Sequence, residues 1–278
     1  MITNFETNKV YFSQGLSSPV FKSAADSLGT AFHDSHVNWA KIPCTLSPLH
    51  IWVRDYMPIQ VSSDRFIQFC YKPDYLKDSP EYKPEVHRIL SHMGIHVYCS
   101  PINLDGGNII SCGDKVIMTD KIFKENPQYS HNRLIEELTE LLEAEPVLIP
   151  WDTYEEYGHA DGMVRYMGEG RVLLNHYCDF DKTLHKRLLT ALEPHFNITE
   201  LHYGTFTGNS WAYLNFLHVG SDIFVPMMGD KLGEMAFEQI AVAFPNCECH
   251  PVLNCESLVS EGGALNCCTW NIQTDQQS

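Results

Sequence analysis

The sequence predicts a fold of the α/β class. Short segments rich in strand-forming residues alternate with helix candidates along the chain. The apolar share of 44% is typical of a globular domain that buries a large core. No linker rich in Gly, Pro or Ser divides the chain, so we expect residues 1–278 to form a single domain.

Six segments are predicted to be strands, because each is short and rich in β-branched or aromatic residues. They are RFIQFCY at 65–71, IHVYC at 95–99, KVIMT at 115–119, PVLIP at 146–150, RVLLNHY at 171–177 and DIFVP at 222–226. Two or three strands accompany each helix, which departs from strict β-α-β alternation. No glycine-rich loop follows any of these strands, and this argues against a dinucleotide-binding or P-loop fold.

Two helices are predicted together with the residues that cap them. Apolar residues recur at helical spacing over 130–144 behind Ser130, and again over 181–195 behind Asp181. Residues 80–94 and 233–245 are further helix candidates.

The charge balance excludes one class of partner and favours another. Nineteen basic residues face 35 acidic ones, giving a formal charge of −16, so a nucleic-acid backbone would be repelled. The same field attracts small cations. No window approaches the roughly 18 apolar residues of a membrane span, and the first residues lack a signal-peptide pattern, so we expect a cytoplasmic protein without a membrane partner.

The ten cysteines are scattered through a long chain, which predicts reduced thiols rather than a disulfide framework. The one metal-like grouping is Cys247, Cys249, His250 and Cys255, and its spacing matches none of the paired zinc patterns. We therefore interpret it as core thiols near a strand edge.

Four segments place charged or nucleophilic side chains among glycines, prolines or aromatic residues. They are IWVRDYMP (51–58), NLDGGNII (103–110), YGHADGMVRYM (157–167) and SEGGALNCCTW (260–270). In the first, Asp55 lies in a stretch so apolar that its carboxylate must be paired, with Arg54 or another cation, or must bind a ligand. In the second, two glycines follow Asp105, which suits a tight turn into a strand-end cleft or an ordinary hairpin.

The other two segments supply a histidine and a pair of thiols. His159 and Asp161 are two residues apart, so on an extended chain they share a face, where a carboxylate can orient a proton-shuttling imidazole. Cys267 and Cys268 follow glycines, and because neighbours on a strand face opposite ways, at most one of them is expected to be catalytic. A nearby His159 cation is expected to lower the pKa of that thiol.

A thiol, a histidine and three acids together suit attack on the cationic carbon of a guanidinium group. Two carboxylates can hold the planar cation, the thiolate attacks its carbon, and the histidine protonates the leaving nitrogen and then activates water. This chemistry needs no metal or cofactor, and we expect none. A cysteine peptidase or amidase is an alternative that leaves the three acids without a role, and a module that only binds guanidinium is another.

The order of the motifs resembles the agmatine deiminase and bacterial-type peptidylarginine deiminase family of guanidine-modifying enzymes. The likeness runs through WVRDYMP, DGG, GHADGMVRY, WAYLNF at 211–216 and EGGALNCCT, from about Trp52 to Thr269. It implies a five-bladed, pseudo-symmetric α/β propeller with roughly 55 residues per blade. It also implies a hydrolase that converts a small cationic guanidino substrate, agmatine or a relative, to a ureido product and ammonia, and it is compatible with a homo-oligomer.

The resemblance assigns roles to individual residues. Cys267 falls on the family nucleophile through the pattern Cys-x-Thr, and it would carry a covalent thiouronium intermediate. His159 matches the acid and base, and Asp105 matches the acid that supports it. Asp55 and Asp161 match the carboxylates that grip the guanidinium.

The substrate is less closely defined than the chemistry. Trp52 and Arg54, beside Asp55, are also expected to contact substrate. Peptidylarginine, free arginine and dimethylarginine stay alternative substrates, and amidino transfer an alternative reaction. An arginine would require a cation for its carboxylate, for which Arg54, Arg165 and Arg171 are the candidates.

Three residues depart from the family pattern. Asp105 replaces the glutamate of agmatine deiminases, Asn266 stands where a histidine is common, and Met57 replaces a glycine. Each is expected to alter the pocket wall. The chain is also shorter than a usual agmatine deiminase, so loops that close over agmatine are expected to differ.

Overall fold

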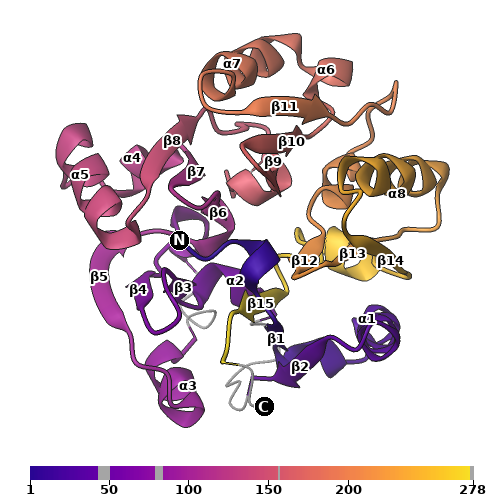
Figure 1. Ribbon diagram of the computed structural model, residues 1–278, viewed down its shortest axis with the longest axis horizontal. Helices are drawn as coiled ribbons and strands as arrows, with labels where there is room; N and C mark the ends of the chain where they lie inside the picture. Colours follow the sequence, from indigo (N-terminus) through magenta and orange to yellow (C-terminus); the bar gives the residue numbers. More distant parts are fainter. Residues whose placement is uncertain (43–50, 79–83, 156, 276–278) are drawn as a thin grey trace.

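The protein is a ring of five small sheets around a central axis (Figure 1). The computed structural model describes residues 1–42, 51–78, 84–155 and 157–275, and in this part of the chain each sheet has three strands. The middle strand of every sheet pairs antiparallel with the strand next to the axis and parallel with the outer strand. The predicted α/β class and five-bladed propeller are confirmed.

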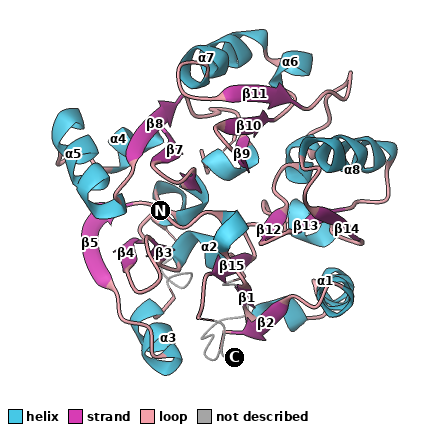
Figure 2. Ribbon diagram, viewed as in Figure 1, coloured by secondary structure: helices cyan, strands magenta, loops and turns pink. Residues whose placement is uncertain are grey.

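The blades follow one another around the ring, and the helices lie mostly on the rim (Figure 2). The sheets, each given from the axis outward, are β15-β1-β2 (Thr269–Ile272, Lys9–Phe12, Asn38–Lys41), β3-β4-β5 (Ile59–Gln60, Phe66–Cys70, Tyr98–Asn103), β6-β7-β8 (Ile110–Ser111, Lys115–Thr119, Glu145–Ile149), β9-β10-β11 (Val164–Gly168, Arg171–Leu174, Asn197–Glu200) and β12-β13-β14 (Leu217–Val219, Asp222–Pro226, Glu248–Val252). The helices are α1 (Lys22–Asp34), α2 (Val53–Tyr56), α3 (Val86–Met93), α4 (Lys121–Glu125), α5 (His131–Leu142), α6 (Tyr177–Phe180), α7 (Lys182–Leu192), α8 (Lys231–Ala243) and α9 (Glu256–Ser260).

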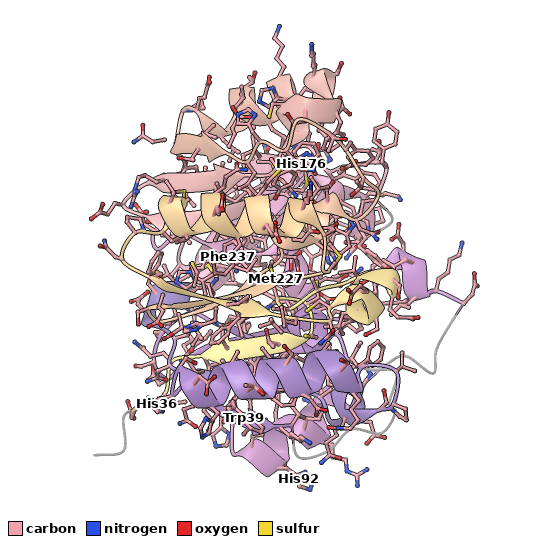
Figure 3. The ribbon with its side chains drawn as sticks, turned by 90° about the vertical axis from the view of Figure 1, so that its right-hand side faces the viewer. His36, Trp39, His92, His176, Met227 and Phe237 are labelled. Carbon is pink, nitrogen blue, oxygen red and sulfur yellow. The ribbon has the colours of Figure 1, made fainter. Side chains whose placement is uncertain are left out.

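Only one of the two strand pairs in each blade is parallel and requires a helical crossover, which explains why strands outnumber helices. Parallel neighbours cannot be joined by a tight hairpin, so the chain crosses from the middle strand to the outer strand through a helix. Seen from the side, α8 and α1 lie across the outside of their blades, and Met227 and Phe237 pack against the core beneath α8 (Figure 3). The first blade is completed by β15, so segments from both ends of the sequence close the ring.

The predicted strands recur with small shifts. Residues 115–119 and 222–226 are strands over their full predicted length. The strand predicted at 95–99 runs instead from Tyr98 to Asn103. The one predicted at 171–177 ends at Leu174, because the Asn175 side chain hydrogen-bonds to neighbouring backbone groups and turns the chain into α6.

Both predicted helix caps are formed. The Ser130 hydroxyl accepts a hydrogen bond from the Arg133 amide at the start of α5. The Asp181 carboxylate accepts from the Thr183 and Leu184 amides at the start of α7. Such caps satisfy amides that have no partner within the helix.

The other two helix candidates are also helices with different ends. α8 begins two residues before the predicted start at residue 233. α3 ends at Met93 and is followed by Gly94, which has the left-handed conformation typical of the residue after a helix end. Residues 80–83 of that prediction lie outside the described residues.

The cysteine-rich segment is divided between two cores, as its interpretation as core thiols requires. Cys255 is buried with α1, whereas Cys247 and Cys249 pack against the core beneath α8. His250 pairs instead with Asp222, 2.8 Å away. All nine cysteines in the described residues are free thiols. The described helices are all too short or too polar to span a bilayer.

Candidate active site

One segment from each blade reaches the axis, directly before the strand nearest to it. These segments contain α2 before β3, the 3₁₀ turns Gly106–Asn108 before β6, Ala160–Gly162 before β9 and Ser210–Tyr213 before β12, and the turn at 264–268 before β15. Four of them line a cavity of about 330 Å³, here called the axial cavity, and the segment with Gly106–Asn108 reaches it through Asp105, which contacts His159. The structure therefore brings together all four segments selected from the sequence and adds a fifth, residues 210–215.

Cys267 lies in the wall of the axial cavity and is 7% exposed. Its thiol donates a hydrogen bond to Asn215 Oδ1 at 3.2 Å, and Asp161 Oδ2 lies 3.7 Å from the sulfur. Cys268 is fully buried in the neighbouring core. The two thiols face opposite ways as expected, although they lie in a turn rather than in a strand.

The pKa of the Cys267 thiol is raised in the protein without substrate, rather than lowered as expected from a nearby His159 cation. Burial raises the pKa of Cys267 well above its ordinary value, and the carboxylates of Asp161 and Asp55 raise it further. The protonated thiol is therefore the resting form, because a thiolate here would be poorly solvated and would lie beside negative charge.

His159 lies between two carboxylates. Its Nε2 is 3.0 Å from Asp105 Oδ2, and its Nδ1 is 3.7 Å from Asp55 Oδ1. Burial acts to lower the pKa of His159, but Asp55 and Asp105 outweigh it and raise the pKa to about 10. Burial raises the pKa of Asp55 to about 7, against the opposing effect of His159. At neutral pH the imidazole is thus a cation that can donate a proton.

Asp161 is fixed by its neighbour Asn266. The Asn266 side-chain amide donates to Asp161 Oδ2 at 2.7 Å, so the departure from a histidine at position 266 supplies a direct partner to this carboxylate. His159 directly precedes the 3₁₀ turn Ala160–Gly162, and Asp161 lies within that turn, so the two are not on an extended strand as expected. Both nevertheless line the axial cavity.

Two glycines allow these side chains to approach the backbone. A Cβ atom at Gly107 would lie 2.5 Å from His159 Nδ1 and 2.7 Å from Asp55 Oδ1. A Cβ atom at Gly263 would lie 2.3 Å from the Trp52 ring. The paired glycines after Asp105 and before Cys267 are therefore required by close packing at the site.

Aromatic side chains form much of the cavity wall. Trp52, predicted from the sequence, lines it together with Trp211, Tyr75 and Tyr157. Tyr75 also donates to Asp105 Oδ2 at 2.9 Å. Trp211, Tyr75 and Asn215 had no predicted role, although WAYLNF at 211–216 is one of the segments that carry the resemblance.

The axial cavity is acidic. Besides Asp55 and Asp161 it is lined by Glu155 and Glu261, and among its described lining residues there is no lysine or arginine. Burial raises the pKa of Glu155 to about 7. The cavity therefore favours a ligand that carries positive charge along its length.

The three arginines considered for substrate binding lie elsewhere, which corrects the prediction for Arg54. The Arg54 side chain points away from the cavity and donates to the Asn266 carbonyl and to Asn271. Arg165 is buried over the ring of Phe216. Arg171 lies on β10 and is not among the lining residues.

Within the described residues, two groups of side chains have the spacing of metal ligands. They are Cys178, Asp179 and His202, and Asp222, Glu248 and His250. Neither group contributes a residue to the axial cavity.

Comparison with known proteins gives a family match over nearly the whole chain. The family model of the Porphyromonas-type peptidyl-arginine deiminase matches residues 2–272. A Mycoplasma capricolum protein provisionally assigned as an agmatine deiminase is 25% identical over 214 residues, which cover 63% of this chain and 58% of the relative. The match thus spans less than two thirds of that relative's length.

Solved structures show the same fold. Agmatine deiminase of Enterococcus faecalis superposes with a TM-score of 0.77 at 18% identity, covering 99% of this chain and 95% of that one. A C. jejuni agmatine deiminase with a cysteine-to-serine substitution, solved with substrate bound, superposes with a TM-score of 0.75 at 15% identity, covering 98% and 96%.

Proposed function

Because the chain belongs to the Porphyromonas-type peptidyl-arginine deiminase family, we propose that it hydrolyses a small guanidino compound to a ureido product and ammonia. The observation that carries the proposal is the convergence of Cys267, His159, Asp55 and Asp161 on one acidic cavity. A peptidase or amidase has no use for two carboxylates around its nucleophile.

The carboxylates suit a planar cation. A guanidinium group that donates to both Asp55 and Asp161 would bring its carbon close to the Cys267 sulfur, since that sulfur is 3.7 Å from Asp161 Oδ2. The indole rings of Trp52 and Trp211 supply aromatic surface to a delocalised cation.

Substrate binding brings a positive charge that stabilises the thiolate form of Cys267. Without substrate, the carboxylates around Cys267 disfavour its thiolate. A bound guanidinium neutralises those carboxylates and places a positive charge beside the sulfur, which lowers the thiol pKa. We infer that the thiol proton passes to solvent as the substrate binds, so that the nucleophile is ionised mainly in the complex.

The reaction then proceeds in two stages. The Cys267 thiolate forms a bond to the guanidinium carbon, His159 donates its proton to one terminal nitrogen, and the C–N bond breaks to release ammonia. The thiouronium left on Cys267 is attacked by water, which gives a proton to the now neutral His159. The C–S bond breaks and the sulfur leaves with its electron pair. The remaining hydroxyl proton of the intermediate passes through solvent to that sulfur, which frees the neutral ureido product and restores the resting thiol. Asp105 orients the imidazole throughout.

The cavity favours agmatine or a similar amine over arginine. An arginine carboxylate would face Glu155 and Glu261 without a compensating cation from the described lining residues. An aminoalkyl tail would instead carry positive charge toward those acids. We further propose that residues 1–278 act as one catalytic domain, since every blade contributes to the site, and that the free thiols reflect a cytoplasmic protein.

The test is release of ammonia and ureido product from agmatine, arginine, dimethylarginine, guanidinobutyrate and an arginyl peptide, beside the Cys267→Ala variant. We expect turnover of agmatine, or of another small guanidine without a carboxylate, that is lost in the variant. Silence across the panel, or turnover that survives in Cys267→Ala, would overturn the proposal. An amide substrate cleaved equally well after Asp55→Asn would establish the amidase instead.

The tail preference has its own test. Glu155→Gln should raise KM for agmatine and leave KM for butylguanidine, which has a neutral tail, unchanged. An equal effect on both substrates would place the amine elsewhere. Glu261→Gln serves as the matched variant at the more exposed end of the cavity.

A further inference from the structure

A larger groove adjoins the axial cavity in the blade of β9, β10 and β11, beside α6 (Figure 1). Its volume is about 750 Å³, and its walls come from α6, from the segment after β8 and from the chain between β11 and the turn Ser210–Tyr213. Glu155, Gly162 and Trp211 line both the groove and the axial cavity. Because both spaces are open to solvent, a ligand bound in the axial cavity can extend past these residues into the groove. We call it the tail groove.

Aromatic rings form a continuous wall of the tail groove. The ring centres of Tyr177 and Phe180 are 5.2 Å apart, and those of Phe180 and Phe206 are 4.3 Å apart. Phe206 is 52% exposed, and Trp211 continues the wall toward the axial cavity. Such a surface suits a chain of methylene groups, and the faces of the rings attract a cation.

The lining of the tail groove is also negatively charged. Among its described residues one lysine, the exposed Lys182, is opposed by four acids, which are Asp152, Glu155, Asp179 and Asp181. Burial lowers the pKa of His176, so this histidine adds no positive charge at neutral pH. The groove therefore attracts cations and repels anions.

The carboxylates of the groove can accept further hydrogen bonds. The Glu155 side chain makes no hydrogen bond or ion pair with another described residue. Asp181 binds the first amides of α7 through Oδ1 alone. Asp152 accepts one hydrogen bond at each oxygen, from the Tyr154 amide and the Tyr177 hydroxyl, whereas a carboxylate has about four acceptor positions.

Charge and shape together define the occupant. A tail that ends in a carboxylate would be repelled, and a neutral apolar tail would cover the acids without compensating their charge. Ammonium groups on a methylene chain satisfy both walls, because the methylenes contact the rings and the ammonium groups bind the carboxylates. Burial raises the pKa of Glu155, and the charges of Asp161 and Asp152 raise it further. A cation near Asp152 would thus relieve its repulsion of Glu155.

We propose that the tail groove binds the distal amine of a substrate in which a linear polyamine carries the guanidino group at one end. This inference rests on the proposed hydrolysis of guanidino compounds and names a substrate class that extends beyond agmatine. The guanidinium lies between Asp55 and Asp161, and the first ammonium group lies at Glu155. The next methylene segment then runs along Phe206, with the terminal ammonium group at Asp152.

Binding is measured by calorimetry in the Cys267→Ala background, where turnover does not interfere. The probes are N-(3-aminopropyl)agmatine and N-butylagmatine, which have the same length and differ in a terminal ammonium or methyl group. We expect the Kd of the aminopropyl compound to be about tenfold lower, through ion pairing and cation–π contact. Asp152→Asn should reduce this preference about fivefold, the effect of a partly exposed ion pair, whereas the exposed Asp34→Asn should not.

A second variant tests the aromatic wall. Phe206→Ala should weaken binding of the aminopropyl compound about threefold and leave agmatine, which does not reach Phe206, unaffected. Tyr98→Ala, at another exposed aromatic residue, is the matched control. Because Phe206 is half exposed, this variant decides the question if Asp152→Asn does not fold.

The outcomes separate this inference from the proposed function. If the parent protein hydrolyses agmatine and the aminopropyl compound binds no better than N-butylagmatine, the polyamine assignment alone is overturned. A preference that survives in both variants would also overturn it, and tighter binding of an arginyl peptide would assign the groove to peptides. Absence of turnover with every guanidino compound would overturn the proposed function and, with it, the substrate role of the groove.

Discussion

Replacing Asp161 by asparagine should make Cys267 more reactive toward a neutral alkylating agent and, at the same time, abolish turnover of guanidino substrates. The Asp161 carboxylate is the nearest negative charge to the sulfur, at 3.7 Å, and after burial it is the largest cause of the raised thiol pKa. Asparagine keeps the shape of the side chain and removes its charge. The variant also lacks one of the two carboxylates that are proposed to hold the guanidinium.

The size of the effect follows from Coulomb's law. Two unit charges 4 Å apart interact by about 4 kcal/mol at an effective dielectric constant of 20. If relaxation around Asn266 leaves only about a third of this repulsion, its removal lowers the thiol pKa by about one unit, because one unit corresponds to about 1.4 kcal/mol. At a fixed pH below the thiol pKa, the thiolate fraction then rises about tenfold. The rate of alkylation by iodoacetamide should rise by the same factor.

The assay follows the Cys267 peptide by mass spectrometry over a pH series, since other thiols of the chain also react. Asp55→Asn is the matched variant and should give a smaller increase, because Asp55 contributes less to the raised thiol pKa. An alkylation rate that is unchanged or slower in Asp161→Asn would refute the electrostatic account of the resting thiol.

Three other properties can be checked in the same preparations. The value of kcat/KM should rise with pH most steeply below about 7, where Asp55 ionises to hold the cation, and should stop rising near 10, where His159 loses the proton it must donate while the Cys267 thiol still ionises; a profile flat over this range would contradict these assignments. Gly107→Ala should lower kcat/KM about a hundredfold by displacing those two side chains, with an unchanged circular dichroism spectrum, whereas Gly29→Ala, with open space around it, should be fully active. Asp181→Ala should lower the free energy of unfolding by about 1 kcal/mol in urea denaturation, since α7 loses the cap on two amides; no change would mean that water replaces the cap.

Much of the fold was predictable because its signals are local. Hydrophobic patterns located the strands at 115–119 and 222–226, and the side chains of Ser130 and Asp181 marked the starts of two helices. The ring itself depends on pairing between distant strands such as β1 and β15, which no local pattern encodes. For that, the resemblance was needed, and the family it indicated is confirmed.

The functional site was likewise predictable only in part. Asp55, Asp105, His159, Asp161 and Cys267 were selected from motifs, and the structure brings them together. The prediction that Arg54 contacts substrate was wrong, because α2 directs the consecutive side chains of Arg54 and Asp55 to opposite sides, and only Asp55 lines the axial cavity. The resting state of Cys267 also escaped prediction, because it depends on burial and on which carboxylates lie nearest in space.

The active site is complete only when the ring of five blades is closed, because each axial segment belongs to a different blade. No two of its five segments are neighbours in sequence, and the one that carries Cys267 is followed at once by β15, the strand that fastens the last blade to the first. Opening any one blade removes a part of the site and loosens the others. Loss of activity in denaturant should therefore coincide with global unfolding rather than precede it, so turnover would report on the cooperativity of the whole fold.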